Sequence, residues 1–522
     1  MIRAGQAKAK PVLPTTTWPI ESMHPMSPAR PALLAALLLL AASLPAFPVA
    51  AQERDDTRRM LDQSVERHAL QRERELLKDE LDDDGPRPTL DIEGKSYTVE
   101  RSASDLGRAL YLSIQQKRWD AAQRFLAEYL TLADHDPLLL HYAQGALARR
   151  DGRYADAERH YRALLALKPD FLPGRLELAR VLFEDQQDRE AGELFDAIAA
   201  AVDAGDPRTA GVRKSVQAFQ RALASRRAWS GAFAFGPTWN DNLNRSSASR
   251  TCLLADSSGF CYIDRQLPAA IGAGGVDYDA SLDKRLPLRG HHGLYLRSLL
   301  FGNGYRGHSA YNELTTTTQA GYSYRSGRHG ISLAPSFEYY AWGNDALYAA
   351  WGVHGEWNWT LSPSSLLKLE ADYKDMRYRR QDYARNYDGG LRSAYATYFR
   401  SLGPRWTVFG GIDVVASDAR QAANGYLQRG ARLGASLQWP AGFVGSAFAS
   451  YRHRDYDAYS AVLGARRRDG EQNYTVVLKA PRLAFAGFTP LLSLRHNRVH
   501  SNVDWLYGYD KNAISLKLER VF

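Results

Sequence analysis

Two kinds of hydrophobic periodicity divide the chain near residue 228. Between residues 101 and 227, apolar side chains recur at the three- and four-residue spacing of amphipathic helices. Beyond Ala228, apolar and polar positions alternate instead with a period of two, which is the spacing of β-strands. The pattern therefore predicts a multidomain α + β protein, with an N-terminal all-α domain followed by a β domain.

The helical part contains a repeat of 34 residues. The recurring positions are Gly145, Ala157, Tyr161 and Leu164, then Ala179, Ala191, Phe195 and Ile198, with a looser copy upstream at Leu110, Ala122, Leu126 and Tyr129. A period of 34 is that of the tetratricopeptide repeat, in which small residues let two antiparallel helices approach. Three copies are about the minimum for a stable stack. We expect a tetratricopeptide-repeat domain at 101–227, closed by an amphipathic helix at 211–227; a plain helical bundle is the alternative.

The alternating segments of the β domain are long. In LKLEADY, the side chains of Lys368, Glu370 and Asp372 share one face and apolar side chains share the other. The segments run about ten to fourteen residues, which is long for soluble strands and suits strands tilted through a bilayer. About fourteen of them follow Trp229, and long connections alternate with short turns. We therefore predict an antiparallel transmembrane β-barrel of about 14 strands at 228–522.

The final strand supports this prediction. Ile514, Leu516, Leu518 and the terminal Phe522 fall on one face. A terminal aromatic residue on the lipid face is typical of barrels in bacterial outer membranes, whereas an ordinary exposed phenylalanine is the alternative. An even number of strands leaves both ends of the barrel on one side of the membrane. We expect that side to be the periplasm, where the repeat domain must also lie.

The N-terminus carries the features of a secretory signal peptide. Arg30 precedes the apolar run 32–44 and the small residues Val49, Ala50 and Ala51. The run is shorter than the roughly 20 apolar residues that a membrane-spanning helix needs. We predict a signal peptide at 1–51 that is cleaved after Ala51, with Met23 or Met26 as alternative starts.

Residues 52–100 are predicted as a charged linker. Residues 52–86 are dense in Glu, Arg and Asp and end in DDDGPRP, which indicates a solvated helix or a tether. Residues 89–100 alternate apolar and polar positions about a glycine, which would suit a small hairpin.

Composition and charge narrow the possible partners. Of the 522 residues 29 are Tyr, 11 Trp and 41 Gly, and these gather in the C-terminal part, as the two-domain division requires. The net charge of +9 would suit nucleic acid, yet the 67 Lys and Arg are spread among 58 Asp and Glu. Because no recognition motif accompanies the charge, we expect no nucleic-acid partner.

The sequence shows no motif for catalysis or cofactor binding. It lacks GxSxG, HExxH and Walker patterns, so we predict no catalytic residue, metal or cofactor and no enzymatic activity. The two cysteines, Cys252 and Cys261, match no zinc, haem or redox spacing. In an oxidising compartment we expect them to form a loop disulfide.

Three segments resemble a known family, the surface lipoprotein assembly modulators (Slam) of Gram-negative bacteria. They are RLELARVLFEDQQDREAGELFDAI (175–198), GPTWNDNLNRSS (236–247) and the final strand KNAISLKLERVF (511–522). The resemblance covers nearly all of the mature chain. It implies a periplasmic repeat domain and a fourteen-stranded outer-membrane barrel that helps a client surface lipoprotein, or a related secreted protein, to cross the outer membrane. A periplasmic chaperone that hands over the client is also implied, and the barrel-assembly machinery and outer-membrane lipid are further expected partners.

Two sets of residues are candidates for contact with a client. On the repeat template, the groove-facing positions of the first helices are Tyr142, Arg149, Arg180 and Phe183, a mixture that suits an extended peptide. Packing or surface solvation would explain the same residues equally well. In the barrel, we expect a lumen face with charges of both signs, at Lys368, Glu370 and Asp372, and a lumen row or the start of a turn at Asn240, Asn242 and Asn244.

Two rival functions remain open from the sequence. Polysaccharide-exporting barrels also carry tetratricopeptide arrays, but usually with many more repeats and with one sign of charge in the lumen. A diffusion porin with an accessory periplasmic domain is the other rival, which conductance in a planar bilayer would test.

Overall fold

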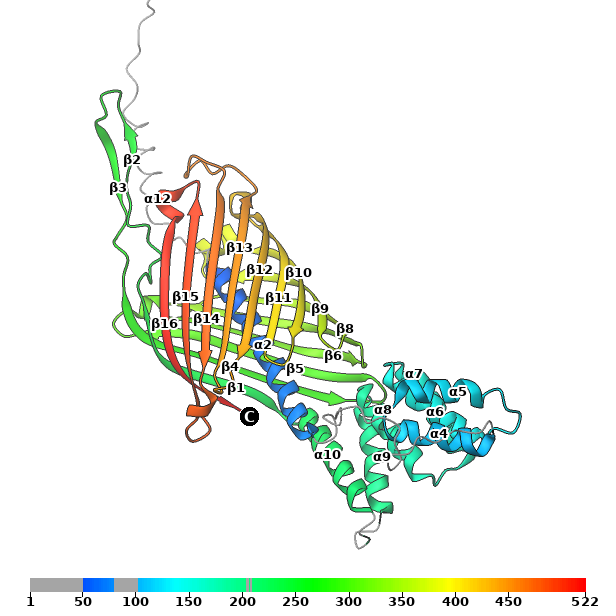
Figure 1. Ribbon diagram of the computed structural model, residues 1–522. Coiled ribbons are helices and arrows are strands. Elements are labelled where there is room, and N and C mark those ends of the chain that lie inside the picture. Colours follow the sequence, from blue (N-terminus) through cyan, green and yellow to red (C-terminus); the bar gives the residue numbers. More distant parts are fainter. Residues whose placement is uncertain (1–49, 79–101, 203–205, 207–208) are drawn as a thin grey trace, which may run out of the picture. The chain divides into compact units, whose positions relative to one another are not determined.

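The computed structural model describes residues 50–78, 102–202, 206 and 209–522 (Figure 1). The predicted hairpin at 89–100 and nearly all of the predicted signal peptide at 1–51 lie outside these residues. Everything described belongs to one compact unit, Ala46–Phe522. Within the described part of the chain, no helix has both the length and the apolar character needed to cross a membrane.

The helical domain consists of three antiparallel pairs and a closing helix, which confirms the predicted tetratricopeptide-type domain. The pairs are α4 (Ala103–Gln115) with α5 (Trp119–Tyr129), α6 (Pro137–Arg150) with α7 (Tyr154–Leu167), and α8 (Leu172–Glu184) with α9 (Asp188–Ala201), followed by α10 (Ala210–Arg227). Ser102 caps α4 by accepting a hydrogen bond from the backbone N–H of Asp105, and Asp136 caps α6 in the same way through Leu138.

The repeated positions form the core of this domain. Ala122, Ala157 and Ala191 are fully buried, and the rings of Tyr161 and Phe195 fill the equivalent space beside the last two. The turn between the paired helices also repeats. Its left-handed residue is Lys117, Gly152 or Gln186 in the successive pairs, with φ of 54°, 68° and 62°.

The β domain is a closed antiparallel barrel of 14 strands, as predicted. Its strands are β1 (Ser230–Asn240), β4 (Ala273–Pro287), β5 (His292–Tyr305), β6 (Glu313–Arg325), β7 (His329–Trp342), β8 (Asp345–Ser362), β9 (Ser365–Tyr378), β10 (Gly389–Leu402), β11 (Trp406–Ala419), β12 (Tyr426–Gln438), β13 (Val444–Tyr456), β14 (Arg468–Lys479), β15 (Thr489–Ser501) and β16 (Tyr509–Val521). Each strand pairs with its neighbours along the chain, and β1 closes the barrel against β16.

The two faces of the barrel wall reverse the pattern of a soluble protein. Trp351, Ile412 and Leu433 are 67 %, 63 % and 66 % exposed on the outer face. Lys368 and Asp372, by contrast, are buried on the inner face. An apolar outside and a charged inside are what a barrel in lipid requires.

The connections give the barrel two distinct ends. One end, here called the loop end, carries the long 241–272 connection and the short helices α11 (Gln381–Tyr387) and α12 (Asp504–Tyr507). The other end, the turn end, carries mostly short turns. Strand β1 begins there and β16 ends there, and the Gly231 N–H donates to the Phe522 carbonyl at 3.0 Å. One connection at the turn end, residues 480–488, is longer than the sequence pattern suggested and contains the 3₁₀ turn η5 (Pro481–Leu483).

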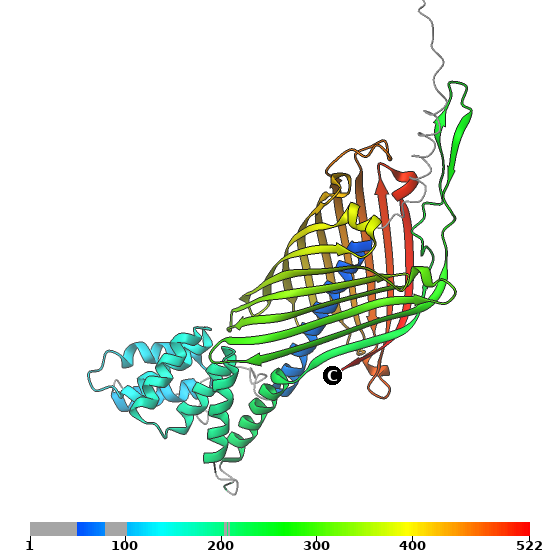
Figure 2. The same ribbon diagram turned by 180° about the vertical axis from the view of Figure 1, so that it is seen from behind.

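Residues assigned from sequence to a solvated linker form helix α2 (Ala50–Leu76), and much of this helix is not solvated. Asp56, Arg58, Arg59 and Asp62 are 5–8 % exposed because they lie against the inward-facing side chains of the strands. Figures 1 and 2 show the helix in blue behind and between the strands of the barrel. The difference has a physical reason: a dense run of charge can be neutralised by opposite charges in a barrel lumen as well as by water.

Candidate functional site

The lumen of the barrel holds α2 through pairs of opposite charge. The Asp56 carboxylate accepts two hydrogen bonds from the Arg452 guanidinium of β13, at 2.7 and 2.5 Å, and one from the Ser450 hydroxyl at 3.1 Å. Arg452 is 1 % exposed and also donates to Asp413 of β11 at 3.2 Å. This cluster fixes the first half of α2 against one side of the wall.

The three charged residues that the sequence placed on the lumen face of β9 all lie beside α2. Glu370 accepts from Arg59 at 2.6 Å, Asp372 lies 3.5 Å from Arg58, and the Lys368 ammonium lies 3.4 Å from Glu66. Both signs of charge occur on the helix and on the strand. Sliding the helix along the strand would bring like charges together, so these pairs favour one register of the helix.

Aromatic rings hold the second and third turns of α2 near the loop end. The Arg54 guanidinium lies 3.7 Å from the centre of the Tyr340 ring and donates to the Tyr348 hydroxyl at 3.0 Å. The Tyr395 hydroxyl donates to Asp55 at 2.5 Å, and Arg59 stacks on the same ring. Cation–π contacts of this kind are strongest where water is excluded.

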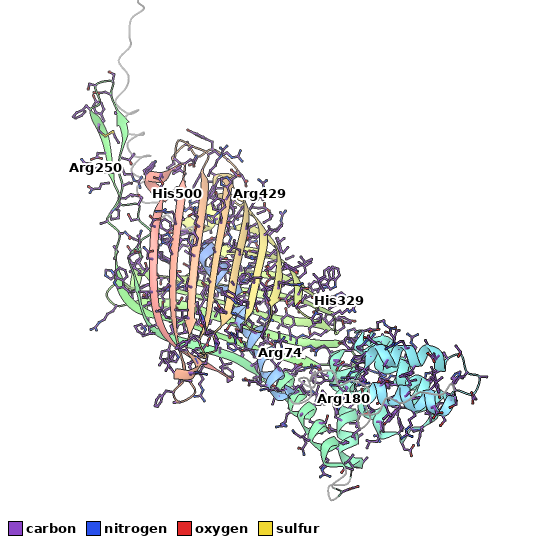
Figure 3. All side chains as sticks on the ribbon, in the orientation of Figure 1. Arg74, Arg180, Arg250, His329, Arg429 and His500 are labelled. Atoms are coloured by element: carbon purple, nitrogen blue, oxygen red, sulfur yellow. A yellow bond between two sulfur atoms is a disulfide. The ribbon has the colours of Figure 1, made fainter. Side chains whose placement is uncertain are left out.

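The last turns of α2 lead to the turn end and to the helical domain. Glu73 accepts two hydrogen bonds from Arg226 of α10, both at 2.8 Å. Arg226 also donates to Asp188 of α9 at 2.6 Å, and Asp188 accepts from Arg285 of β4 at 3.2 Å. In Figure 3, Arg74 marks this part of α2, and Arg180 marks the helical domain.

α2 fills only part of the lumen. A cavity of about 1360 Å³ remains between the helix and the wall, and its lining includes residues of β4, β5, β6 and every strand from β8 to β16. It is lined on the helix side by Met60, Leu61 and Ser64, and on the wall side by Asn473, Ser493, Arg495, Lys517, Glu519, Asp277 and Asp279. Small-molecule pockets have volumes of roughly 300–1,000 Å³, so this space is larger than a metabolite requires.

Several charged residues on the wall of the cavity pair with each other. Lys517 of β16 binds Asp279 of β4, and Arg495 of β15 binds Asp277 of β4. The Ser515 hydroxyl donates to Asp277 at 2.8 Å. All these contacts cross the inner face of β1, which presents the small residues 232, 234 and 236 beneath them.

The predicted asparagine row marks the start of the first loop. Asn240 ends β1, where its amide donates to the Tyr305 hydroxyl at 3.4 Å. Asn242 donates to the Asp510 carbonyl at 2.8 Å, and Asn244 to the Ala269 carbonyl at 2.9 Å. These contacts anchor the loop, and a role of the three amides in the lumen stays a prediction.

The predicted groove residues have partners within the helical domain. Tyr142 and Phe183 are 5 % and 3 % exposed and belong to its hydrophobic core. Arg149 pairs with Glu177 and Glu184, both at 2.6 Å. Burial alone would lower the pKa of Arg149, but these two carboxylates raise it above the ordinary value. Arg180 binds Glu177 at 2.8 Å. Contact of these four residues with a client stays a prediction.

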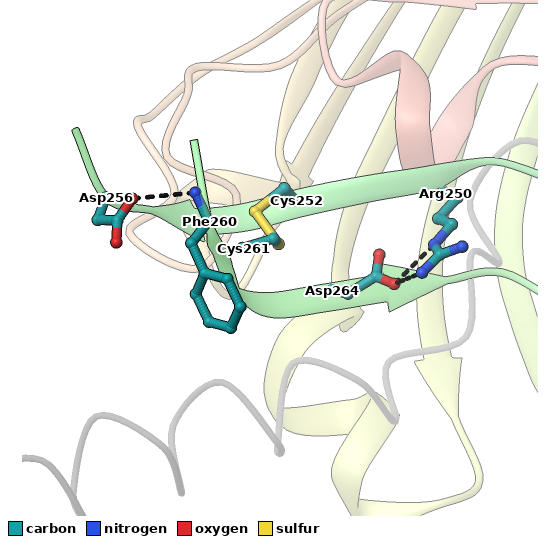
Figure 4. The surroundings of a disulfide bond; sticks show 6 residues. All are labelled: Arg250, Cys252, Asp256, Phe260, Cys261 and Asp264. Atoms are coloured by element: carbon teal, nitrogen blue, oxygen red, sulfur yellow. Dashed lines mark hydrogen bonds and ion pairs between the residues drawn. A yellow bond between two sulfur atoms is a disulfide. The ribbon is translucent and has the colours of Figure 1, made fainter. Parts of the chain in front are cut away.

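Cys252 and Cys261 form a disulfide with Cα atoms 5.8 Å apart (Figure 4). The bond joins β2 (Arg250–Ala255) to β3 (Cys261–Gln266), a two-stranded hairpin within the 241–272 connection. Arg250 binds Asp264 across the hairpin, and the Asp256 carboxylate accepts from the Phe260 N–H at 2.9 Å.

Sequence reasoning missed the residues of α2 and their partner Arg452. The only local signal was that Asp55, Arg59, Asp62 and Glu66 fall on one face of a helix, at spacings of three and four. That signal shows a charged stripe but gives no partner, because the pairing of Asp56 with Arg452 spans 396 residues.

Two family models match this chain. Residues 229–522, more than half of the chain, match the model described as surface lipoprotein assembly modifier. Residues 92–195 match the model of the N-terminal TPR repeats of the same family.

Curated relatives cover nearly the whole chain. The hemophilin secretion modulator of Acinetobacter baumannii is 40 % identical over 479 residues, which are 90 % of this chain and 96 % of that protein. Surface lipoprotein assembly modifier 1 of Neisseria meningitidis serogroup B is 27 % identical, over 83 % of this chain and 86 % of the relative. The protein of the same name from Haemophilus influenzae is 26 % identical over 80 % and 84 %.

Proposed function

Because this chain belongs to the surface lipoprotein assembly modifier family, we propose that it delivers client proteins across the outer membrane. The clients would be surface lipoproteins or related secreted proteins, since the names of its relatives refer to surface lipoproteins and to hemophilin. The family consists of assembly and secretion factors, and delivery in this proposal includes no catalytic step.

The observation that carries this proposal is a closed barrel whose lumen combines a charged helix of the same chain with a cavity too large for a metabolite. A passive porin would need a continuous open lumen, which α2 obstructs. A polymer exporter would favour one sign of charge, whereas Lys368, Glu370 and Asp372 carry both.

We propose that the turn end and the helical domain face the periplasm. A barrel with an even number of strands has both its ends on one side, and α10 leads directly into β1 at the turn end. In this orientation the helical domain would receive clients from a periplasmic chaperone. The barrel-assembly machinery would insert the barrel, and outer-membrane lipid would surround its apolar face.

The proposal is tested by co-expressing the full chain with a candidate surface lipoprotein encoded nearby. Client exposure is measured with an antibody on intact cells, and total client on broken cells. We expect exposure only in cells that contain this protein, with an empty vector as the control. Equal exposure with the vector, or a client that stays hidden while the purified barrel conducts ions or sugars, would contradict it.

Client capture by the groove of the helical domain is part of this proposal. We expect Arg149→Ala with Arg180→Ala to weaken client binding by the full chain. Because these changes leave Glu177 and Glu184 without their partners, thermal melting is measured beside binding. Weaker binding at an unchanged melting temperature supports the groove, and unchanged binding excludes these two residues.

A further inference from the structure

The seam between β1 and β16, where the first and last barrel strands meet, differs from every other strand junction. All the other neighbouring strands are joined to each other by a connection of the chain, but β1 and β16 are not. The seam can therefore part without unfolding a hairpin. In Figure 1 it is the line where the red strand β16 meets the green strand β1.

The hydrogen-bonded ladder of the seam is interrupted at its centre. Pairing runs from Ala232 with Val521 to Phe235 with Leu518, stops at Gly236 and Pro237, and resumes at Thr238 with Ser515. Pro237 has no N–H to donate. A similar gap faces Pro335 between β6 and β7, but a turn joins those two strands.

Side chains, rather than the ladder alone, hold the seam closed on its inner face. Lys517 of β16 reaches over β1 to bind Asp279 of β4, and it lies 3.6 Å from Asp277. These side chains line the cavity, so a molecule inside the cavity can reach and compete for them.

A single ring covers the outer face of the seam near the turn end. Phe488, in the 480–488 connection, lies 5.8 Å from Phe233 and 6.3 Å from Phe235 of β1, measured between ring centres. Arg520 of β16 lies against the same ring. The ring therefore contacts both strands of the seam from the lipid side.

The position of α2 adds a second, independent observation. The helix bonds to side chains of β5, β8, β9, β10, β12, β13 and β14. The cavity beside it is lined by residues around most of the barrel, and these include Asp277 and Asp279 of β4 and Lys517 and Glu519 of β16. The unoccupied part of the lumen therefore extends to the strands on both sides of β1, although it is not confined to them.

We infer that the barrel opens sideways at the seam while α2 stays in place, and that an extended polypeptide segment of the client occupies the cavity between α2 and the seam. This inference rests on the proposed function and names the route by which the client would cross the membrane. The expected occupant is a polypeptide, because separated strands expose backbone N–H and C=O groups that must be paired within a membrane. An extended peptide offers such partners along its length.

The test joins the two strands covalently. The hydroxyls of Thr238 and Ser515 lie 2.8 Å apart on the lumen face, so Thr238→Cys with Ser515→Cys should form a disulfide across the seam. The matched control is Ser298→Cys with Thr318→Cys on β5 and β6, two strands that a connection of the chain joins; their hydroxyls also lie 3.0 Å apart, and neither residue lines the cavity. The native disulfide is present in both variants.

Client exposure on intact cells is compared before and after treatment with dithiothreitol. We expect the oxidised seam variant to lose exposure to the background level and to regain it on reduction, while the oxidised control keeps it. Recovery on reduction also shows that the variant is folded. Exposure that survives the seam disulfide, or that both disulfides abolish equally, would overturn the inference. If the unmodified protein exposes no client, the proposed function fails instead.

Discussion

The two sides of the barrel lumen differ in where their charges find partners. On the side of α2, Arg452, Glu370 and Lys368 are matched by charges of the helix. On the side of the seam, Lys517 and Arg495 are matched by acids of the wall itself. The first side is complete only when the helix is bound. The second is complete without a ligand as long as the seam is closed.

The largest effect is expected from reversing a charge on α2. With Asp56→Arg, Arg452 would face a cation where it now has a carboxylate at 2.5 Å. Removing one partner of a buried ion pair costs about 3–5 kcal/mol. We therefore expect the first half of α2 to leave the wall and the conductance of the barrel in a planar bilayer to rise several-fold.

The matched control for this reversal is Glu75→Arg, an exposed position on the same helix. It makes the same change of charge, and we expect the conductance to stay near that of the unmodified protein. If Asp56→Arg leaves conductance unchanged, or if both variants raise it equally, the ion pairs do not hold α2 in the lumen.

A smaller effect is expected on the seam side. Asp277→Asn removes the carboxylate that Arg495 and Ser515 share and that Lys517 approaches. Hydrogen bonds to charged groups contribute about 1.5–3 kcal/mol each. We expect the free energy of unfolding in urea, followed by tryptophan fluorescence, to fall by an amount in this range.

The comparison for Asp277 is Asp418→Asn, which breaks an ion pair with Arg392 that is more than half exposed on both sides. Exposed pairs contribute at most about 1 kcal/mol. Losses of equal size in the two variants would mean that the contacts across the seam are no stronger than surface pairs.

A weaker effect is expected from the outer face of the seam. Phe488→Ala removes two ring contacts with β1, and aromatic pairs contribute about 0.5–1.5 kcal/mol each. Unfolding in urea should show a loss of this size, whereas Phe485→Ala, in the same turn but 83 % exposed, should show little. A larger loss from Phe485→Ala would exclude Phe488 as a contact that holds the seam.

Much of the fold could be predicted from the sequence because its signals are local or periodic. The 34-residue repeat places Ala157 and Ala191 in the helical core, where both are fully buried. The period of two along β9 separates Lys368 from the apolar positions beside it, and the structure buries Lys368 on the inner face. Closure of the barrel follows because lipid leaves no strand edge unpaired.

The arrangement inside the lumen could not be predicted in the same way. A charged stripe such as Asp55, Arg59 and Asp62 has the same composition whether water or a second set of charges surrounds it. Its partners belong to strands hundreds of residues away, and no spacing rule relates them. The groove residues were predicted in part. The repeat template placed Arg149 on the correct helix, but it did not predict its partners Glu177 and Glu184.

The last prediction is that fixing α2 to the barrel wall leaves client exposure unchanged. Asp56→Cys with Ser450→Cys would join α2 to β13, where the two native side chains lie 3.1 Å apart. If the client passes between α2 and the seam, exposure on intact cells should be the same before and after reduction, because the helix need not move. Exposure that appears only on reduction would show that α2 must leave the lumen, and the route would then run through the space that the helix occupies. The two disulfides therefore distinguish the two routes. If the client leaves through the seam, the disulfide between β1 and β16 abolishes client exposure, whereas the disulfide between α2 and β13 leaves it unchanged.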